Sequence, residues 1–214
     1  MSTQNVTIID YGMGNLFSIQ SVFQKLGVNV TVSSDPQIIS NSDKLILPGV
    51  GAFQKAMEEL KKRNHIEAIN EFVSKGKPLM GICLGMQLLF SQSEEFGLES
   101  GLNLIPGKVI RFHKPEENSL KIPHIGWNSI NQPKNNSRTW DNTILKDLPY
   151  GTQLYFVHSY ICYPDNKEYF LAETSYGSDT FCSVVNKDNI WGCQSHPEKS
   201  GSSGIRIYEN FLQL

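Results

Sequence analysis

The segment Leu79–Phe90, with the sequence LMGICLGMQLLF, decides the fold of this chain. Its first residues, Leu79 to Cys83, form a short apolar run that is typical of a buried strand, and Leu84 to Phe90 has helical character. Strand meets helix at Cys83 without a spacer, and glycines two positions before and two after it allow close backbone approach. This pattern predicts a nucleophile elbow, a tight turn that exposes a reactive side chain.

Around this segment, short apolar runs alternate with stretches of helical spacing. In the first half, strands are predicted at 6–10, 29–32 and 44–47, and helices at 15–26 and 57–73, the second broken near Asn64. This alternation predicts a mostly parallel sheet with helices on both faces and a ligand site at the carboxyl ends of its strands. Asp10, Gly49 and Cys83 are expected at that edge.

The second half has a different character. Residues 113–142 are polar and predict loops, with one edge hairpin around Gly126 and Trp127. Strand-like composition at 154–161, 170–174, 181–185 and 190–193 makes the last third β-rich, and an amphipathic helix follows Gly204. We therefore predict one α/β domain over residues 1–214, with a flavodoxin-like, mostly parallel central sheet and a β-rich C-terminal third.

Composition excludes several classes of function. The chain has 214 residues and a formal net charge of −2, which provides no general attraction to nucleic acid or to an anionic membrane. No signal peptide or membrane span is recognisable, so a cytoplasmic protein is expected. The four cysteines include no Cys-x-x-Cys pair, which argues against zinc and against a disulfide framework. We expect free thiols, no metal and no cofactor.

Cys83 is the candidate nucleophile. At the start of a helix, unpaired N–H groups and the helix dipole favour a thiolate and can bind an oxyanion. A buried structural cysteine is the alternative interpretation, so a base is needed as independent support. His196 is the best candidate, because Glu198 lies two residues beyond it and can orient the imidazole as in a catalytic triad.

The other histidines have weaker claims. His158 is the competing base, but it lies in an aromatic run without a nearby acidic residue, so we predict a packing or backbone-positioning role for it. His65, His113 and His124 lie in polar or loop segments and are expected at the surface.

These motifs together resemble a known family. Gly-Ile-Cys-Leu-Gly-Met-Gln at 81–87 and His-Pro-Glu at 196–198 resemble the class I, triad-type glutamine amidotransferases. Further segments look like the glutaminase subunits of imidazole glycerol phosphate synthase and cover the chain from end to end. They are IDYGMGN at 9–15, PGVGAF at 48–53, IGWN at 125–128, VHSY at 157–160 and HPEKS at 196–200.

The resemblance implies a site and a reaction. Cys83 would attack the side-chain amide of glutamine, His196 would protonate the departing ammonia, and Glu198 would orient His196. Backbone N–H groups of Leu84 and of the Val50–Gly51 loop would stabilise the oxyanion. The residues that would hold glutamine are Gly49, Gly51, Gln87, Ser159 and Tyr160, although Gln87 could be only an exposed helix residue and Gly51 only a turn glycine.

The resemblance also implies a partner. In the family a TIM-barrel cyclase forms a heterodimer with the glutaminase, and uses its ammonia to make imidazole glycerol phosphate and an aminoimidazole carboxamide ribonucleotide in histidine biosynthesis. The chain shows no recognisable phosphate-binding loop of its own, so the ammonia is expected to be used on another subunit. Candidates for the docking face are Tyr11, Asn15 and Trp127.

Three alternatives remain open from the sequence. Ser195 and Phe17 depart from the family pattern, and paralogues that supply ammonia for amidine formation on surface-polysaccharide sugars share the catalytic motifs. A stand-alone cysteine hydrolase on a similar fold is a second alternative, against which Gln87 and the Gly12–Asn15 loop argue. A non-catalytic binding protein is the third, and the intact Cys83, His196 and Glu198 argue against it.

Overall fold

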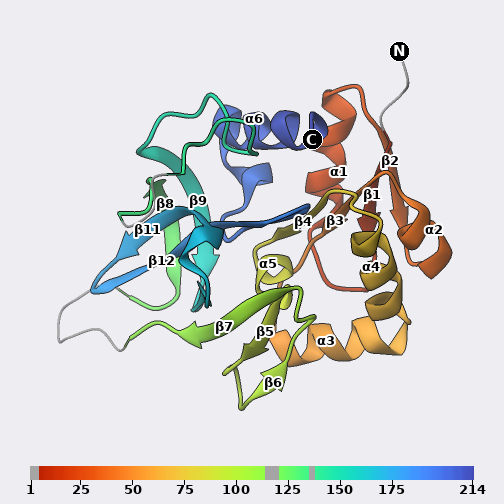
Figure 1. Cartoon of the computed structure of the whole chain (residues 1–214), viewed down its shortest axis with the longest axis horizontal. Coiled ribbons are helices and arrows are strands. Elements are labelled where there is room, and N and C mark those ends of the chain that lie inside the picture. Colours follow the sequence, from red (N-terminus) through yellow and green to blue (C-terminus); the bar gives the residue numbers. More distant parts are fainter. Residues whose placement is uncertain (1–4, 114–120, 135–137) are drawn as a thin grey trace.

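The computed structural model describes residues 5–113, 121–134 and 138–214 and places an 11-stranded mixed sheet at the centre of the molecule (Figure 1). The first half of the chain builds β1 (Asn5–Ile9), α1 (Leu16–Lys25), β2 (Asn29–Ser33), α2 (Pro36–Asn41), β3 (Lys44–Leu47), α3 (Phe53–Lys62), α4 (His65–Ser74), β4 (Leu79–Ile82) and α5 (Leu84–Leu88). The remainder builds β5 (Phe90–Ser93), β6 (Glu99–Ser100), β7 (Ile105–Arg111), β8 (His124–Ile130), β9 (Thr152–His158), β10 (Tyr160–Pro164), η1 (Lys167–Tyr169), β11 (Phe170–Tyr176), β12 (Asp179–Lys187), β13 (Ile190–Cys193), η2 (Pro197–Lys199) and α6 (Gly201–Leu212).

Local sequence signals explain where several helices begin and end. Asn15 caps α1, because its side-chain oxygen accepts a hydrogen bond of 3.4 Å from the Ser18 amide. Asn64 separates α3 from α4 by adopting a left-handed conformation with φ of 58°, which confirms the predicted break. Asp35 caps α2 in the same way as Asn15, with Pro36 in its first turn, but α2 was not predicted from the sequence.

The sheet joins a parallel part to an antiparallel part. Strands β2, β1, β3, β4 and β13 lie side by side in this order and are all parallel. Strand β13 lies between β4 and β12, and from β12 through β10 to β7 the pairing is antiparallel. This arrangement confirms the predicted mostly parallel central sheet and the β-rich C-terminal third.

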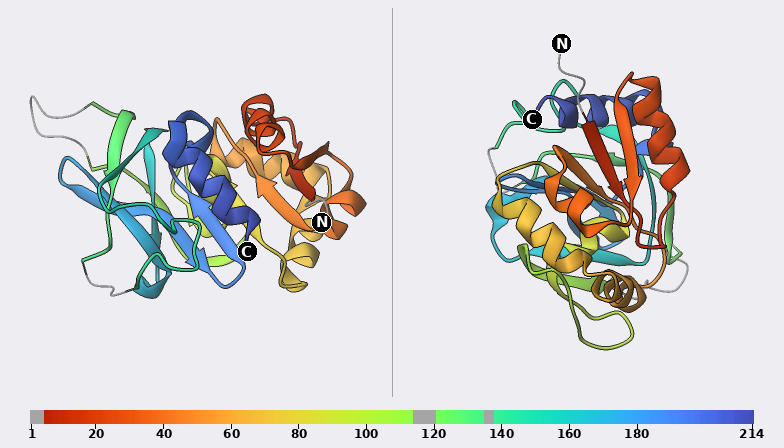
Figure 2. Two further views of the ribbon diagram at one scale, coloured as in Figure 1. Left: turned by 90° about the horizontal axis from the view of Figure 1, so that it is seen from above. Right: turned by 90° about the vertical axis from the view of Figure 1, so that its right-hand side faces the viewer.

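Helices cover both faces of the parallel part (Figure 2). On one face, α1 and α6 pack on side chains such as Ile46 and Met80, and the rings of Phe23 and Tyr208 join the two helices with their centroids 4.8 Å apart. On the other face, α2 to α5 pack on Leu45, Leu47 and Leu79. Neighbouring residues of one strand point to opposite faces, so each buried strand serves both hydrophobic cores.

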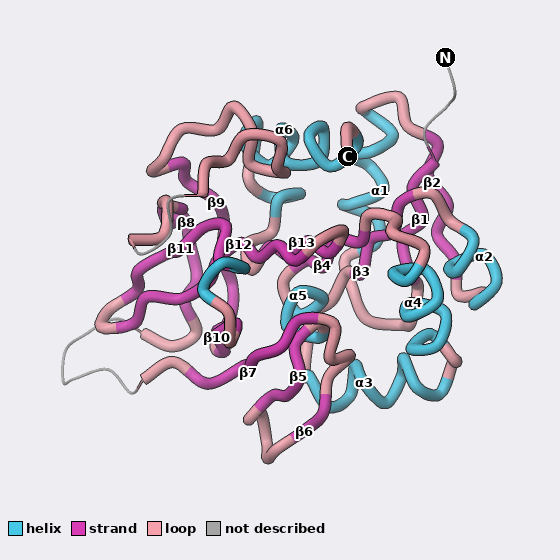
Figure 3. Tube along the Cα trace, in the orientation of Figure 1, coloured by secondary structure: helices cyan, strands magenta, loops and turns pink. Residues whose placement is uncertain are grey.

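The strand-rich half differs from the prediction in three places (Figure 3). The segment around Gly126 and Trp127 does not form a hairpin with itself, because β8 pairs antiparallel with β9 in a separate two-stranded sheet. The run 154–161 is not one strand, because a bend at Ser159 separates β9 from β10. Strands β5 to β7 have no prediction to match them. The polar stretch 114–120 of the predicted loop region lies outside the described residues.

None of the described helices has the length and apolar character needed to cross a membrane.

Candidate active site

Cys83 lies on the predicted strand-to-helix turn, between β4 and α5, in a backbone conformation that side chains rarely adopt, with φ of 54° and ψ of −112°. The glycines around it are required by close packing. A Cβ atom on Gly81 would lie 2.6 Å from the Gly85 carbonyl oxygen, and a Cβ on Gly85 would lie 1.9 Å from the Leu47 oxygen. The turn can therefore form only because both positions lack a side chain.

The Cys83 sulfur is almost enclosed, with the residue 6% exposed. It lies 3.8 Å from the Val157 carbonyl oxygen, to which the thiol donates, and 3.9 Å from the Gln194 side-chain amide, which donates to the sulfur. Two elements of the strand-rich half, β9 and the segment after β13, thus contact a nucleophile that the parallel half carries.

His196 and Glu198 form a buried pair beside this turn. Nδ1 of His196 lies 2.8 Å from Oε1 of Glu198, and the two side chains are 3% and 1% exposed. The backbone around the pair is fixed, because the Ser200 hydroxyl donates to the His196 carbonyl at 2.7 Å and accepts from the Tyr155 amide at 2.9 Å. The Tyr208 hydroxyl of α6 donates to the other carboxylate oxygen at 3.4 Å. The two-residue spacing in the sequence therefore gives the expected imidazole–carboxylate contact.

The pKa of His196 is determined by its burial and by its two neighbours, Cys83 and Glu198. Burial acts to lower the pKa of His196, but the Cys83 sulfur and the Glu198 carboxylate together outweigh burial and raise this pKa from 6.5 to about 10. Nε2 of His196 is buried and forms no hydrogen bond with the described residues, while the Cys83 sulfur is close enough to favour the protonated imidazole. A protonated His196 with an unused Nε2 is suited to donate a proton to a bound molecule.

The loop after β3 packs directly on the nucleophile turn. A Cβ atom on Gly49 would lie 2.7 Å from the Gly85 nitrogen and 2.9 Å from Cβ of Leu84, so this position must be a glycine. Gly51 has φ of 104° and a Cβ there would meet Met13 at 3.0 Å. The structure therefore brings the Val50–Gly51 loop and Leu84, the predicted oxyanion donors, to the same edge of the sheet. Their role as donors stays a prediction.

Tyr11 does not lie where it was expected. Its ring is fully buried, its hydroxyl donates to the Pro48 carbonyl at 2.8 Å, and burial together with the Cys83 charge raises its pKa. A buried side chain offers no surface to a partner, so its assignment to the docking face was wrong and Tyr11 instead supports the loop after β3. Of the other candidates, Asn15 is half-buried and Trp127 is 56% exposed.

Two of the predicted glutamine-binding residues, Gln87 from the first half of the chain and Tyr160 from the second, are in direct contact. Gln87 is buried, which excludes the alternative of an exposed helix residue. Its side-chain amide donates to the Tyr160 carbonyl at 3.2 Å and to Oε1 of Gln194 at 3.1 Å. Ser159 and Tyr160 form the half-buried turn between β9 and β10. Gln194, which connects Gln87 to Cys83, was missed, and its position two residues before His196 was the only signal for it.

The remaining histidines correct one prediction. His113 is exposed as expected, and its ring contacts the buried Asp179 carboxylate. His65 and His124 are buried, so their assignment to the surface was wrong. Both follow a polar sequence segment. Nε2 of His65 lies 2.9 Å from the Ser34 carbonyl oxygen, while its Nδ1 is buried with no hydrogen-bond partner among the described residues, and Nδ1 of His124 lies 3.0 Å from Nε2 of His158. His158 has no carboxylate partner among the described residues.

The other cysteines have no chemical context of their own. Cys162, Cys182 and Cys193 are fully buried and unpaired, and burial raises the pKa of each thiol. Within the described ranges, no group of three or more His, Cys, Asp or Glu side chains is arranged to hold a metal ion.

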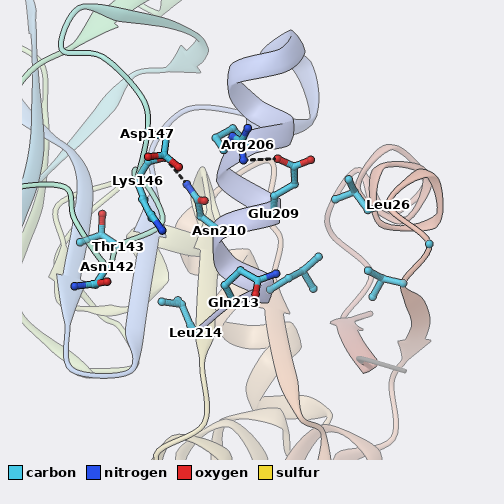
Figure 4. A pocket seen from close by; sticks show the side chains of 13 residues that line it. Leu26, Asn142, Thr143, Lys146, Asp147, Arg206, Glu209, Asn210, Gln213 and Leu214 are labelled. Atoms are coloured by element: carbon cyan, nitrogen blue, oxygen red, sulfur yellow. Dashed lines mark hydrogen bonds and ion pairs between the residues drawn. The ribbon is translucent and has the colours of Figure 1, made fainter. Parts of the chain in front are cut away.

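A cavity of about 1000 Å³ lies elsewhere, between the end of α1, the loop at 142–147 and α6 (Figure 4). Arg206 and Glu209, which line it, form an ion pair of 3.2 Å, and Asn210 donates to the Lys146 carbonyl at 2.8 Å. No cysteine, serine or histidine is found among the described residues that line this cavity, so the chemistry is assigned to the site around Cys83.

Comparison with known proteins agrees with this geometry. The family model "Glutamine amidotransferase class-I" matches residues 7–214. Among solved structures, PurLQS from Thermotoga maritima superposes with a TM-score of 0.71 at 14% identity, over 99% of this chain and 98% of the other. A glutamine amidotransferase from the same organism gives a TM-score of 0.60 at 16% identity, over 100% and 85%. The chain therefore has the fold of the class I glutamine amidotransferases and belongs to this class of enzymes.

More similar relatives define the subgroup. The imidazole glycerol phosphate synthase subunit HisH 1 of Legionella pneumophila (strain Paris) is 44% identical over 212 residues, or 98% of this chain and 99% of the relative. The subunit HisH of Sulfurimonas denitrificans is 48% identical over 209 residues, or 97% of each chain. Within its class, the chain belongs to the HisH family of imidazole glycerol phosphate synthase subunits.

Proposed function

We propose that this chain releases ammonia from glutamine with Cys83 as nucleophile, His196 as general acid and base, and Glu198 as the group that orients His196. One observation carries the assignment of roles. A cysteine in a rare backbone conformation lies beside a buried imidazole that is bonded to a carboxylate through Nδ1 and has an unused Nε2. Each group supplies one part of nucleophilic catalysis.

In the first half of the reaction, Cys83 in its thiolate form, beside protonated His196, attacks the side-chain amide carbon of glutamine. The carbonyl oxygen becomes an oxyanion, for which the Leu84 amide and an amide of the Val50–Gly51 loop are the donors. Removal of one such donor typically costs about 10²–10³-fold in rate. As the carbon–nitrogen bond breaks, His196 gives its Nε2 proton to the leaving nitrogen, and ammonia and a thioester result.

In the second half, neutral His196 takes a proton from water, and the resulting hydroxide adds to the thioester carbon. The second oxyanion forms in the same place. The carbon–sulfur bond then breaks, Cys83 leaves as a thiolate beside protonated His196, and the product loses its carboxyl proton to water and departs as glutamate. Glu198 stabilises the imidazolium whenever it forms and holds a proton on Nδ1, so that Nε2 is the nitrogen that exchanges its proton with the reacting atoms.

The relatives are named as subunits of a synthase, and we infer from this that the ammonia passes to a synthase subunit. We infer that this partner is a TIM-barrel cyclase, that the two chains form a heterodimer, and that the product is imidazole glycerol phosphate in histidine biosynthesis. In bulk water most ammonia would be protonated and would lose its nucleophilicity, so an enclosed path to the partner is required.

The docking face that we propose lies close to the triad. Ile125 and Trp127 are 59% and 56% exposed and point to the same face of β8, being two residues apart. The Trp127 ring lies 6.1 Å from the ring of Tyr155, and Lys199 Nζ lies 5.8 Å above the Tyr155 ring. Because the Tyr155 carbonyl accepts from the His196 amide at 2.8 Å, a partner on this surface would be adjacent to the site of ammonia release.

We place the reaction in the cytoplasm. The four cysteines are unpaired in the structure, which is typical of proteins from a reducing compartment.

The deciding experiment measures ammonia release from glutamine by the purified chain, alone and with its cyclase subunit and the cyclase ligand. We expect stimulation by the cyclase and complete loss of ammonia release in Cys83→Ala, while the cyclase still works with added ammonium. Cys182→Ala is the matched control, because it removes a buried cysteine outside the triad. Ammonia release that survives Cys83→Ala, or that is absent from the wild-type complex, would overturn the proposal.

A further inference from the structure

Two buried histidines take no part in the proposed reaction. His124 on β8 and His158 on β9 face each other as partners in the two-stranded sheet, and they are 2% and 6% exposed. The His124 ring stacks on Tyr176 with centroids 4.0 Å apart and on Phe156 at 5.1 Å. Phe112 and Phe181 also pack on both imidazoles. The two polar rings thus lie inside an aromatic cluster, where an unused polar atom would be costly.

A series of hydrogen bonds runs through the two rings. Asn128 Nδ2 lies 3.3 Å from Nε2 of His124, whose Nδ1 lies 3.0 Å from Nε2 of His158. Nδ1 of His158 lies 2.8 Å from the carbonyl oxygen of Tyr160. We call this series of four residues the imidazole relay.

Elementary chemistry gives the relay one direction. The Tyr160 carbonyl only accepts, so His158 Nδ1 carries a proton, and in a neutral ring Nε2 is then an acceptor. His124 Nδ1 must donate to that Nε2, which leaves His124 Nε2 to accept from the Asn128 amide. Every ring nitrogen is satisfied, and each tautomer is assigned from its neighbours.

Both rings must be neutral for this pattern to exist. Burial lowers the pKa of His124 to about 4. Burial also lowers the pKa of His158 to about 3 and outweighs the hydrogen bond to the Tyr160 carbonyl, which acts to raise it. The hydroxyl of Tyr176, the other titratable group against His124, donates to the Lys121 carbonyl at 2.7 Å. At neutral pH the relay is therefore uncharged and its direction is fixed.

The relay ends on the wall of the active site. The Tyr160 carbonyl that accepts from His158 also accepts from Gln87 at 3.2 Å. Gln87 is bonded to Gln194, whose amide contacts the Cys83 sulfur at 3.9 Å. The other end of the relay lies on β8, where the Asn128 side-chain amide also donates to the Ser175 carbonyl at 3.0 Å. The turn at Ser159 and Tyr160 is thus held from both sides.

We propose that His124 and His158 are positioning residues that hold the Ser159–Tyr160 turn in the conformation needed to bind glutamine. This inference rests on the proposed function, because it assumes that glutamine binds beside Cys83. The relay acts on the glutamine pocket and not on the sulfur, so its loss should weaken reactions that need a bound glutamine skeleton and spare those that need only the nucleophile.

Two reagents separate these effects. The electrophile 6-diazo-5-oxo-L-norleucine mimics glutamine and labels Cys83 only after it binds in the pocket, whereas iodoacetamide alkylates the sulfur without this requirement. The second-order rate of Cys83 labelling is measured with both reagents for each variant of the full chain, together with KM and kcat for glutamine in the complex. Thermal unfolding checks that each variant is folded.

The variants form a matched set. His124→Phe keeps an aromatic ring in the stack but removes both hydrogen bonds. His124→Asn returns an N–H donor close to the Nδ1 position. His158→Asn keeps a donor for Tyr160 but loses the contact with His124. His65→Phe is the control, because His65 is also a buried histidine and bonds to a carbonyl, that of Ser34, away from the site.

We expect His124→Phe to slow labelling by the glutamine mimic about tenfold and to raise KM similarly, while labelling by iodoacetamide stays within twofold of wild type. His124→Asn should recover most of the loss, His158→Asn should fall between the two, and His65→Phe should change neither rate. Equal losses with both reagents, or no loss with the mimic, would overturn the proposal. Failure of the mimic to label wild-type Cys83 that iodoacetamide does label would instead contradict the proposed function.

Discussion

The first half of the chain, which builds most of the parallel strands, and the strand-rich second half position their catalytic groups by different means. In the parallel half, Cys83 is placed by backbone contacts so close that Gly49, Gly81 and Gly85 admit no side chain. In the strand-rich half, His196 and the Tyr160 turn are placed by hydrogen bonds between side chains and backbone groups. Close packing fixes a position rigidly and fails completely when a methyl group is added, whereas a hydrogen bond can be removed at a limited cost.

The largest effect is expected from Gly85→Ala. The added Cβ would lie 1.9 Å from the Leu47 oxygen, a backbone atom that cannot move without displacing β3. We expect the free energy of unfolding to fall by more than about 4 kcal/mol, or the variant not to fold. Gly76→Ala is the control, because its Cβ meets nothing within 4 Å and only the φ of 73° is unfavourable, at about 1 kcal/mol. Denaturant unfolding measures both, and equal losses would break the comparison.

Glu198→Gln tests the strand-rich half of the chain, at the hydrogen bond between Glu198 and His196. The amide cannot stabilise the imidazolium, so we expect glutaminase activity to fall about 10³–10⁴-fold with the fold retained. The pKa of His196 should fall from about 10, because the carboxylate helps to raise it. The decline of activity at high pH should then begin at lower pH than in the wild type. NMR titration of the His196 ring measures this pKa, and an unchanged value would contradict the prediction.

The same pair makes a prediction for stability. The folded-state pKa of His196, about 10, lies above its unfolded value of 6.5, so its stabilising effect is complete below about pH 6.5 and is lost as the pH rises to 10. Glu198→Gln should weaken this dependence. Unfolding free energies of wild type and variant at several pH values across this window measure the difference, and parallel curves would show that the pair does not contribute.

Gln87→Leu tests the contact between the two halves. The change removes the Gln87 donor from the Tyr160 carbonyl, which keeps His158, and from Gln194 Oε1, which keeps the weaker Cys162 thiol, and we expect a loss of about 2 kcal/mol in unfolding free energy. Gln92→Leu, on the exposed part of β5, is the matched control and should stay within about 0.5 kcal/mol of wild type. A loss at Gln87 no greater than at Gln92 would mean that this bridge between the halves is not energetically important.

The smallest effect on the isolated chain is expected from Trp127→Ala. The ring is largely exposed, so the unfolding free energy should change by less than about 0.5 kcal/mol. Affinity for the cyclase subunit should nevertheless fall about tenfold or more, since exposed tryptophans at interfaces contribute strongly to binding. Isothermal titration with the cyclase measures this, and an unchanged dissociation constant would remove Trp127 from the docking face.

The comparison also explains which parts were predictable from the sequence. The turn at Cys83, the parallel strands and the His196–Glu198 pair depend on short-range patterns, and their predicted geometry was found. The pairing of β8 with β9 joins residues such as His124 and His158 that are far apart in sequence, and no local pattern encodes it. Burial of His124, His65 and Tyr11 was missed for the same reason, because each side chain forms its hydrogen bond with a residue far away in the sequence.

The place of β13 has a consequence for biosynthesis of the protein. This strand is the last of those described to leave the ribosome, yet it fills the middle of the sheet, between β4 and β12. Until it arrives, β4 has an open edge, and the thiol of Cys83 has neither His196 nor Glu198 beside it. The reactive centre therefore cannot form before β13 and the His196–Glu198 segment have been synthesised, and until then the nascent chain carries an unpaired strand edge that is open to misassociation.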